Sequence, residues 1–249
     1  MKLISRTLLV HIFWTVIATG LAVLCLSAVN YKKNMPLKSI SVEVEGADSD
    51  AYFLVPSDIE REILKIIGPL AKHTVGDVSC DVIEQELSKN PFIENVDVYV
   101  SGNSQLTARI TQREPILRVI SEGQNFYLDS KGNKVPVSKN YTPRVHVLTG
   151  PMAAKHAQDV LGLVQFIKKD KLLQAFIEQI HYAAGDQIIL VPALGHAQIL
   201  FGAPDRIAEK FENLKEFYSE VVNETGWDIY SSIDLRFRDQ IICKKIPTS

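Results

Sequence analysis

Histidine, cysteine and acidic side chains could bind a metal ion or catalyse a reaction, and in this sequence they are scattered. The six histidines are His11, His73, His146, His156, His181 and His196. They lack metal-ligand spacing such as HExxH, and the sequence contains no GxSxG, GxGxxG or Walker loop. We therefore predict no catalytic residue, no cofactor and no metal ion. The histidines are interpreted as exposed or hydrogen-bonded structural residues.

Two further features resemble reactive sites only superficially. Cys80 and Cys243 have no partner motif for zinc or redox chemistry, so we interpret both as small core residues. The segment "DSKGN" at 129–133 lacks the regular oxygen ligands and the distal glutamate of a calcium loop, which favours a hairpin turn. A membrane-anchored hydrolase stays an alternative, and its active site would have to be assembled from scattered acidic and serine residues.

Charge is divided unevenly along the chain. The formal net charge is -2, but the first 33 residues contain four basic and no acidic residues. The remainder therefore has 23 basic and 29 acidic residues, a net charge of -6. Nucleic-acid binding normally needs clustered lysine and arginine to neutralise phosphates, so this composition argues against it.

An apolar run of 22 residues extends from Leu8 to Val29. As a helix it would be roughly 33 Å long, enough to span the hydrocarbon core of a bilayer. A cleaved signal peptide is less favoured, because its apolar region is usually shorter and ends in small residues. The sequence thus predicts a tail at 1–7 and a transmembrane helix at 8–29. Basic residues flank the run on both sides, so charge alone leaves the orientation open.

The next segment has the order β-α-α-β-β. Residues 37–45 alternate as a strand, and Ser57 and Glu60 have the spacing of a capping box at the start of a helix. A second helix at 79–89 should stop before Pro91, because the residue before a proline avoids the α region. Two strands follow. Helices on one face of a three-stranded sheet would bury these apolar stripes.

After Pro115 the pattern changes to short strands joined by turns. Two amphipathic helices, at 154–168 and 205–223, interrupt the strands. Residues 230–245, "YSSIDLRFRDQIICKK", are expected to form a last hairpin or a long bent strand. The fold class is therefore α+β: one N-terminal transmembrane helix, a first α+β domain and a second, sheet-dominated α+β domain.

Several segments resemble a known family. "NPFIENVDV" and "LTARITQREPILRV" are similar to a POTRA domain. "FYLDSKGNKVPVSKNYTPRVHVLTG", "IILVPALG" and "IDLRFRDQIICKK" look like successive blocks of the FtsQ/DivIB family of bacterial cell-division proteins, in the form found in Bacteroidota. The resemblance implies a POTRA domain at 36–113 and a C-terminal β domain at 114–246.

The resemblance also implies a location and a role. It implies a single-pass protein of the inner membrane at the division septum, with a cytoplasmic N-terminus and a periplasmic body. It further implies a non-enzymatic divisome scaffold that binds FtsB- and FtsL-type single-span proteins and links them to septal peptidoglycan synthesis, with the septal FtsW/FtsI synthase as a further partner. The alternative is a POTRA-bearing secretion or outer-membrane assembly factor.

In the family, the partner adds a strand beside the last strand of the β domain. Carried over to this sequence, the docking strand is 239–244 with Phe237 beside it. The partner-binding residues are then Phe237, Asp239, Gln240, Ile241, Ile242, Cys243 and Lys244. From the alternation alone, Ile233, Leu235 and Phe237 should share the core face, with Arg236 and Arg238 directed away from it. The other interpretation of these residues is an ordinary final strand.

Overall fold

The structure is a computed structural model, and it describes residues 6–45, 53–185, 187–222 and 226–247. These residues form two compact units. The first contains the residues up to 45 together with 54–112, and the second contains residue 53 together with those from 113 onward. Each unit has its own buried apolar cluster.

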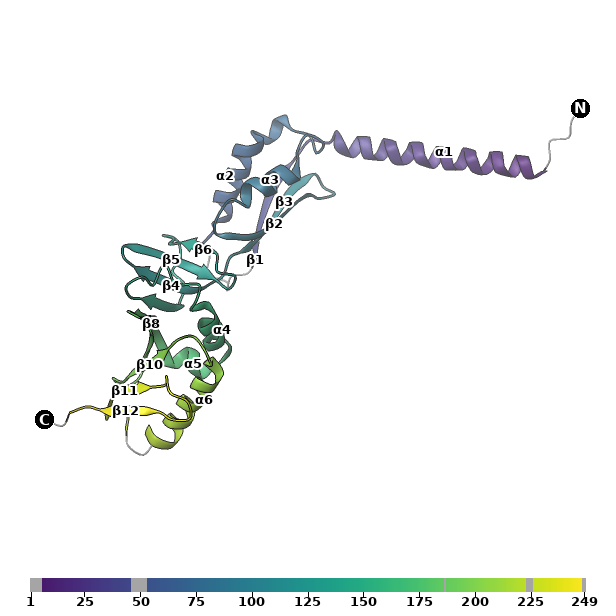
Figure 1. Ribbon diagram of the computed structural model, residues 1–249. Helices are drawn as coiled ribbons and strands as arrows, with labels where there is room; N and C mark the ends of the chain where they lie inside the picture. The colour runs from purple at the N-terminus through teal and green to yellow at the C-terminus, as the bar shows by residue number, and fades with distance from the viewer. Residues whose placement is uncertain (1–5, 46–52, 186, 223–225, 248–249) are drawn as a thin grey trace, which may run out of the picture. The chain divides into compact units, whose positions relative to one another are not determined.

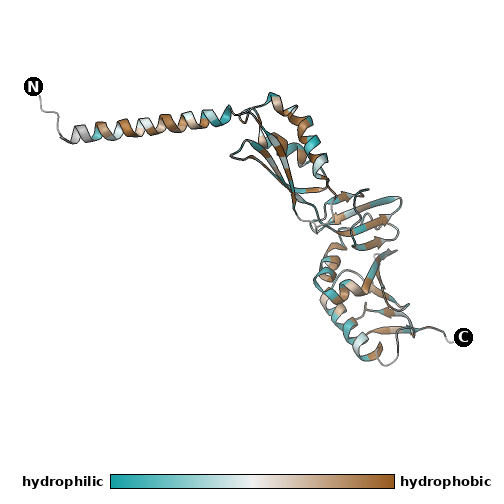
Figure 2. Cartoon of the chain, turned by 180° about the vertical axis from the view of Figure 1, so that it is seen from behind, coloured by the Kyte–Doolittle hydropathy of each residue, from teal (hydrophilic) through white to brown (hydrophobic). Residues whose placement is uncertain are grey.

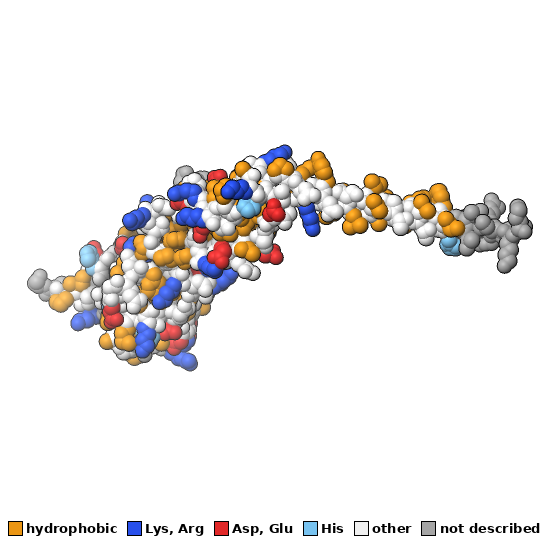
Figure 3. Space-filling view, turned by 90° about the horizontal axis from the view of Figure 1, so that it is seen from above, with side chains coloured by type: hydrophobic (Ala, Val, Ile, Leu, Met, Phe, Trp, Pro, Cys, Tyr) orange, Lys and Arg blue, Asp and Glu red, His pale blue; other side chains and the backbone are white. Residues whose placement is uncertain are grey.

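Helix α1 (Arg6–Lys33) is 28 residues long and contains the predicted apolar run. Its large apolar side chains are exposed; Phe13, Trp14 and Leu24 each have more than half of their surface accessible. Figure 2 shows hydrophobic residues along most of α1, and Figure 3 shows hydrophobic side chains on its visible surface. The segment His11–Lys33 is long and apolar enough to cross a membrane. A helix with apolar residues all round needs an apolar environment.

The predicted β-α-α-β-β order is confirmed in the first unit (Figure 1). Its elements are β1 (Ser39–Glu45), α2 (Pro56–Ile67), the 3-10 turn η1 (Leu70–Lys72), α3 (Cys80–Leu87), β2 (Ile93–Val100) and β3 (Gln105–Gln112). The strand order is β1-β3-β2, with β1 parallel and β2 antiparallel to the central β3. Both β1 and β2 are therefore edge strands.

The apolar stripes of this unit meet in one core. Ile59 and Ile63 of α2 and Ile83 and Leu87 of α3 are buried against the strands. The strand residues of this core are Ile93, Val96, Val98, Leu106, Ala108 and Ile110. Helix α3 ends at Leu87, as predicted from Pro91, and the chain enters β2 at Ile93.

The predicted capping box at the start of α2 is wrong. The helix begins at Pro56 with Val55 as its N-cap, and no side chain caps it. Proline has a fixed φ that suits the first helical position, where its missing N–H would have no partner within the helix. Ser57 therefore lies inside the first turn.

The second unit contains one sheet of nine strands. They are β4 (Pro115–Ser121), β5 (Gln124–Asp129), β6 (Lys134–Pro136), β7 (His146–Thr149), β8 (Ile177–Ala183), β9 (Gln187–Pro192), β10 (Gln198–Gly202), β11 (Tyr230–Asp234) and β12 (Ile242–Lys245). The order across the sheet is β12-β11-β10-β9-β8-β7-β4-β5-β6, with mixed parallel and antiparallel pairs. The sheet-dominated second domain is thus confirmed.

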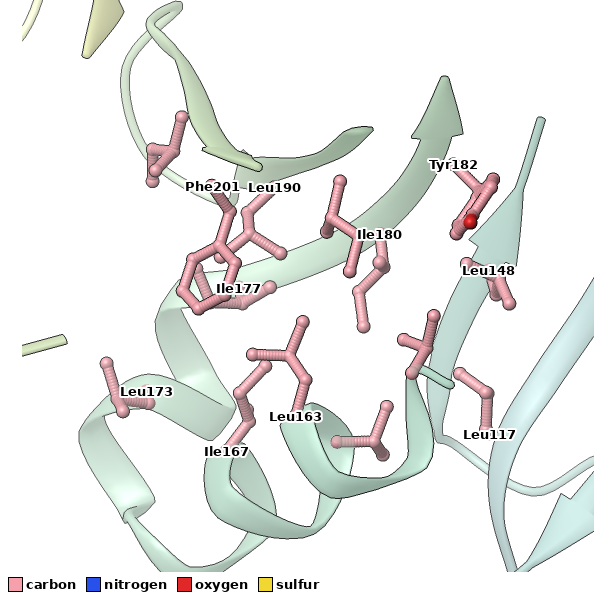
Figure 4. Close-up of a cluster of buried hydrophobic side chains, with 14 of the residues drawn as sticks. Leu117, Leu148, Leu163, Ile167, Leu173, Ile177, Ile180, Tyr182, Leu190 and Phe201 are labelled. Carbon is pink, nitrogen blue, oxygen red and sulfur yellow. The ribbon is translucent and has the colours of Figure 1, made fainter. Parts of the chain in front are cut away.

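Helices cover one face of this sheet. They are α4 (Leu161–Lys169), α5 (Lys171–Phe176) and α6 (Ile207–Phe217), which continues into a π-helical turn η2 (Tyr218–Val222). Figure 4 shows Leu163 and Ile167 of α4 among the buried side chains of β8 to β10, with Leu173 of α5 nearby. This contact buries the apolar face of each helix against one side of the sheet.

The predicted helix at 154–168 starts too early. Residues 151–160 form successive turns, with a left-handed φ of 60° at Met152, and α4 begins at Leu161. A separate short helix, α5, follows α4, because the Asp170 carboxylate accepts the backbone N–H groups of Leu172 and Leu173 and caps a new helix.

The segment "DSKGN" forms the predicted hairpin turn between β5 and β6. The Asp129 carboxylate accepts the backbone N–H groups of Lys131 and Asn133, at 2.9 and 2.8 Å, and Gly132 has a φ of 81°. The carboxylate is thus used inside the turn.

Candidate functional site

The predicted final hairpin is formed by β11 and β12, which pair antiparallel. Cys243 lies opposite Ile233, and Ile242 lies opposite Asp234. Strand β12 is the last strand of the nine-stranded sheet on this side, with β11 as its only neighbour in the described sheet. An edge strand presents a row of backbone N–H and C=O groups that a further strand can bind.

The direction of these backbone groups follows from one hydrogen bond. The Ile246 N–H donates to the carbonyl oxygen of Ile229 at 2.8 Å, so residue 246 faces β11. Alternate residues of a strand point their backbone groups to opposite sides. Lys244 and Ile242 therefore also face β11, whereas Cys243 and Lys245 direct their backbone groups to the open edge.

The docking strand is shorter than predicted. We expected it at 239–244, but β12 begins at Ile242, and residues 236–239 form a bend in which Asp239 has a φ of 56°. Phe237, Asp239 and Gln240 thus precede the strand. Ile241 packs against the core as a partly buried residue, and so does the side chain of Cys243.

Phe237 does not share the core face with Ile233 and Leu235. Both of these are buried, whereas Phe237 is 43% exposed. Strand β11 ends at Asp234, whose carboxylate accepts the backbone N–H of Arg236 at 3.0 Å and its guanidinium at 2.6 and 2.9 Å. These hydrogen bonds turn the chain out of the strand, and they hold the pKa of the Asp234 carboxyl below its ordinary value.

The surface along the edge is apolar and basic. Ile242 is 47% exposed and Ile246 is 41% exposed. The exposed charges on and beside β12 include Arg238, Asp239, Lys244 and Lys245. This arrangement suits an extended segment that contributes backbone hydrogen bonds, apolar side chains and acidic groups.

A hollow of about 420 Å³ lies on the helical side of the same unit. Its lining consists of Leu172, Leu173, Ala175, Phe176, Leu194, Leu214, Lys215, Tyr218, Ser219 and Trp227. Trp227 stacks on Tyr218 with their ring centroids 5.2 Å apart. Burial and the neighbouring Cys243 raise the pKa of Tyr218 to about 12, so its hydroxyl is neutral at physiological pH. The periodicity of the sequence did not indicate this hollow, although Leu172 and Leu194 are apolar residues outside the core pattern.

The histidines fall in separate places. Among the residues that the structure describes, no group of three or more His, Cys, Asp or Glu side chains could hold a metal ion. His146 is buried and has a hydrogen bond with the backbone of Ile177, whereas its Nε2 has no hydrogen-bond partner in the described part of the chain. Burial lowers the pKa of His146 and keeps its ring neutral.

Comparisons with known proteins match both units. A family model described as "POTRA-like domain" matches residues 38–111, and one described as "FtsQ/DivIB, C-terminal related" matches residues 114–244. The named POTRA domain is thus confirmed for the first unit.

Two curated relatives are both named "Cell division protein FtsQ". The protein of Geotalea daltonii is 29% identical in an alignment of 177 residues that covers 66% of this chain and 62% of the relative. The protein of Geobacter sp. strain M21 is 25% identical in an alignment of 199 residues that covers 75% of this chain and 71% of the relative. The Bacteroidota form of the family stays a prediction. Because the C-terminal family model alone covers more than half of the 249 residues, the chain belongs to the FtsQ/DivIB family.

Proposed function

We propose that this chain is a single-pass membrane protein of the cell-division machinery that binds FtsB- and FtsL-type partners along β12 and links them to septal peptidoglycan synthesis. Family membership and the names of the two relatives support a role in cell division. Helix α1 supports the membrane anchor. The proposed role is that of a scaffold without catalytic activity.

The single observation that carries the binding site is the position of β12 at an open edge of the sheet. A strand added there gains backbone hydrogen bonds along its length, and alternate side chains give it specificity. The partner contact is proposed to include Phe237, Ile242 and Ile246 as apolar contacts. Lys244 and Lys245 would attract acidic residues of the partner.

The topology is part of the proposal. Residues 1–7 lie in the cytoplasm, 8–29 cross the inner membrane, and the POTRA domain (36–113) and the β domain (114–246) lie in the periplasm at the septum. The septal FtsW/FtsI synthase is then reached through the single-span partners, which carry the regulatory signal from this scaffold.

The binding site is tested by Lys245→Pro. Lys245 directs its N–H to the open edge, so proline there removes a donor that β11 does not use, and its ring obstructs the incoming strand. We expect the full-length chain to fold and accumulate, but to lose co-purification with the FtsB- and FtsL-type partners. Normal recovery of both partners with a folded Lys245→Pro chain would overturn the docking assignment.

Lys134→Pro is the matched control at the opposite edge of the same sheet. The Asn133 carbonyl oxygen accepts the backbone N–H of Asp129 within the hairpin. The next residue, Lys134, therefore points its N–H away from β5. Partner recovery should be unchanged in this variant. Ile242→Pro, in contrast, removes a donor that faces β11 and should unfold the hairpin as well as prevent binding.

The POTRA-like domain also keeps a secretion or outer-membrane assembly factor as a second candidate. Depletion of the protein in its native bacterium, followed by imaging, separates the two. Filaments with unfinished septa are expected if it acts in division. Normal septation with a defective outer membrane would favour the second candidate.

A further inference from the structure

The first unit has its own open edge at β2. This strand has eight residues, five of them valine, isoleucine or tyrosine, and it contains no proline. Its charged residues are Glu94 and Asp97. A long edge strand of high β-propensity and low charge is a template for pairing with another chain, and proteins usually protect such edges.

Glu84 of α3 covers the centre of this edge. Its Oε1 accepts the backbone N–H of Val98 at 2.7 Å, and the Glu84 side chain is half-buried. Val98 lies opposite Ala108 of β3, yet its N–H is directed to Glu84, so this N–H points to the outer side of β2. By alternation, the amides of Val96 and Val100 point the same way. An incoming strand would therefore have to accept a hydrogen bond from the Val98 N–H, which already donates to Glu84.

We infer that Glu84 closes the β2 edge to strand addition, and that a second copy of this chain pairs there when the carboxylate is removed. Antiparallel pairing of two β2 strands about Val98 places Asp97 opposite the other copy's Tyr99, so no like charges meet. A hydrogen bond to a charged acceptor is stronger than one between neutral groups, and a pairing strand must break it. The inference concerns the POTRA unit and stands independently of the proposed partner site on β12.

The test is the oligomeric state of the full-length, detergent-solubilised chain by analytical ultracentrifugation, with wild type at the same concentration as reference. Glu84→Ala should self-associate with at least about tenfold higher affinity than wild type, because the charge-assisted hydrogen bond from the Val98 N–H to Glu84 no longer competes with strand pairing. Hydrogen exchange of the 93–100 segment should slow in the associated form. An unchanged oligomeric state of Glu84→Ala would overturn the inference.

Three further variants make the result specific. Glu86→Ala lies on the same helix and loses only an exposed ion pair with Lys89, so it should behave as wild type. Glu84→Gln keeps a carbonyl acceptor and should stay closer to wild type than Glu84→Ala. Adding Val100→Pro to Glu84→Ala removes an outward amide of β2 and should reverse any association or aggregation. Association that persists in this double variant would place it elsewhere and refute the role of β2.

Discussion

Lys210 is a buried cation whose ammonium group has three oxygen partners. Its side chain is 3% exposed, and Nζ donates to the carbonyl oxygens of Phe201 and Ala203, at 2.9 and 2.8 Å, and to Asp205 Oδ1 at 2.6 Å. The lysine thus ties α6 to the end of β10. All three N–H donors of the ammonium are used, which is how a buried charge is tolerated.

We predict that Lys210→Met lowers the free energy of unfolding by about 2–4 kcal/mol, because it leaves two carbonyl oxygens without their donor. Urea unfolding followed by circular dichroism measures the change. Lys169→Met, at an exposed position on α4, should change stability by less than about 0.5 kcal/mol. Equal stability of the two variants would show that the Lys210 contacts between α6 and the end of β10 do not stabilise the fold.

Asp129 makes the stability of the second unit depend on pH in the acidic range. Burial alone would raise the pKa of its carboxyl, but hydrogen bonds from Asn133, Arg113 and the backbone of Lys131 outweigh it and lower the pKa below its ordinary value of 3.8. The contribution to stability is therefore complete above the ordinary pKa and is lost as the pH falls through the lowered one. Asp129→Asn should flatten the fall in melting temperature below about pH 4. Asp159→Asn, at an exposed carboxylate, should leave the decrease in melting temperature with falling pH as steep as in wild type.

At the scale of elements, Gly150 ends β7 in a conformation that other residues rarely adopt. Its φ is 117°, and a Cβ there would overlap the carbonyl oxygen of Tyr182 on β8. Gly150→Ala should therefore destabilise the fold by about 3 kcal/mol or more. Gly162, in α4, has open space around its Cβ position, so Gly162→Ala should stabilise by about 0.5–1 kcal/mol. Thermal unfolding of the two variants should shift in opposite directions.

Periodicity predicted the elements well wherever one apolar face decided the structure. The order of the POTRA unit and the end of α3 before Pro91 are examples, because local sterics and burial agree there. It failed where a single polar contact ended or began an element. The bonds from Arg236 to Asp234 end β11 and expose Phe237, and the Asp170 carboxylate starts α5.

The candidate site depended on information that no local pattern contains. Alternation can indicate that 242–245 is a strand, but the neighbours of a strand are set by pairing between distant segments. Strand β11, for example, lies parallel to β10, which is about 30 residues earlier in the chain. The edge position of β12 therefore came from the sheet order, and only the resemblance to a family pointed to it from the sequence. The outward amide of Val98 and its partner Glu84 could not be predicted for the same reason.

For the whole molecule, α1 should decide whether the protein stays with the membrane. Leu21 is near the middle of the apolar segment, and its side chain is exposed on the helix surface. A lysine there should cost about 3 kcal/mol of apparent insertion free energy. Leu21→Lys should thus reduce the fraction of the chain that resists alkaline carbonate extraction. Leu21→Phe should be extracted as little as wild type, and equal extraction of both variants would argue against α1 as the anchor.

The short pairing between β11 and β12 sets a mechanical limit. Four residue pairs join the two strands, and the register shifts at Ser231. A pull along the strands loads these hydrogen bonds together in shear, whereas a pull across the sheet opens them one after another. A molecule held on the outer side of β12 therefore transmits force to the body of the sheet through this joint, together with the core packing of Ile241 and Cys243. The hydrogen-bonded joint itself resists best when tension runs along the strand.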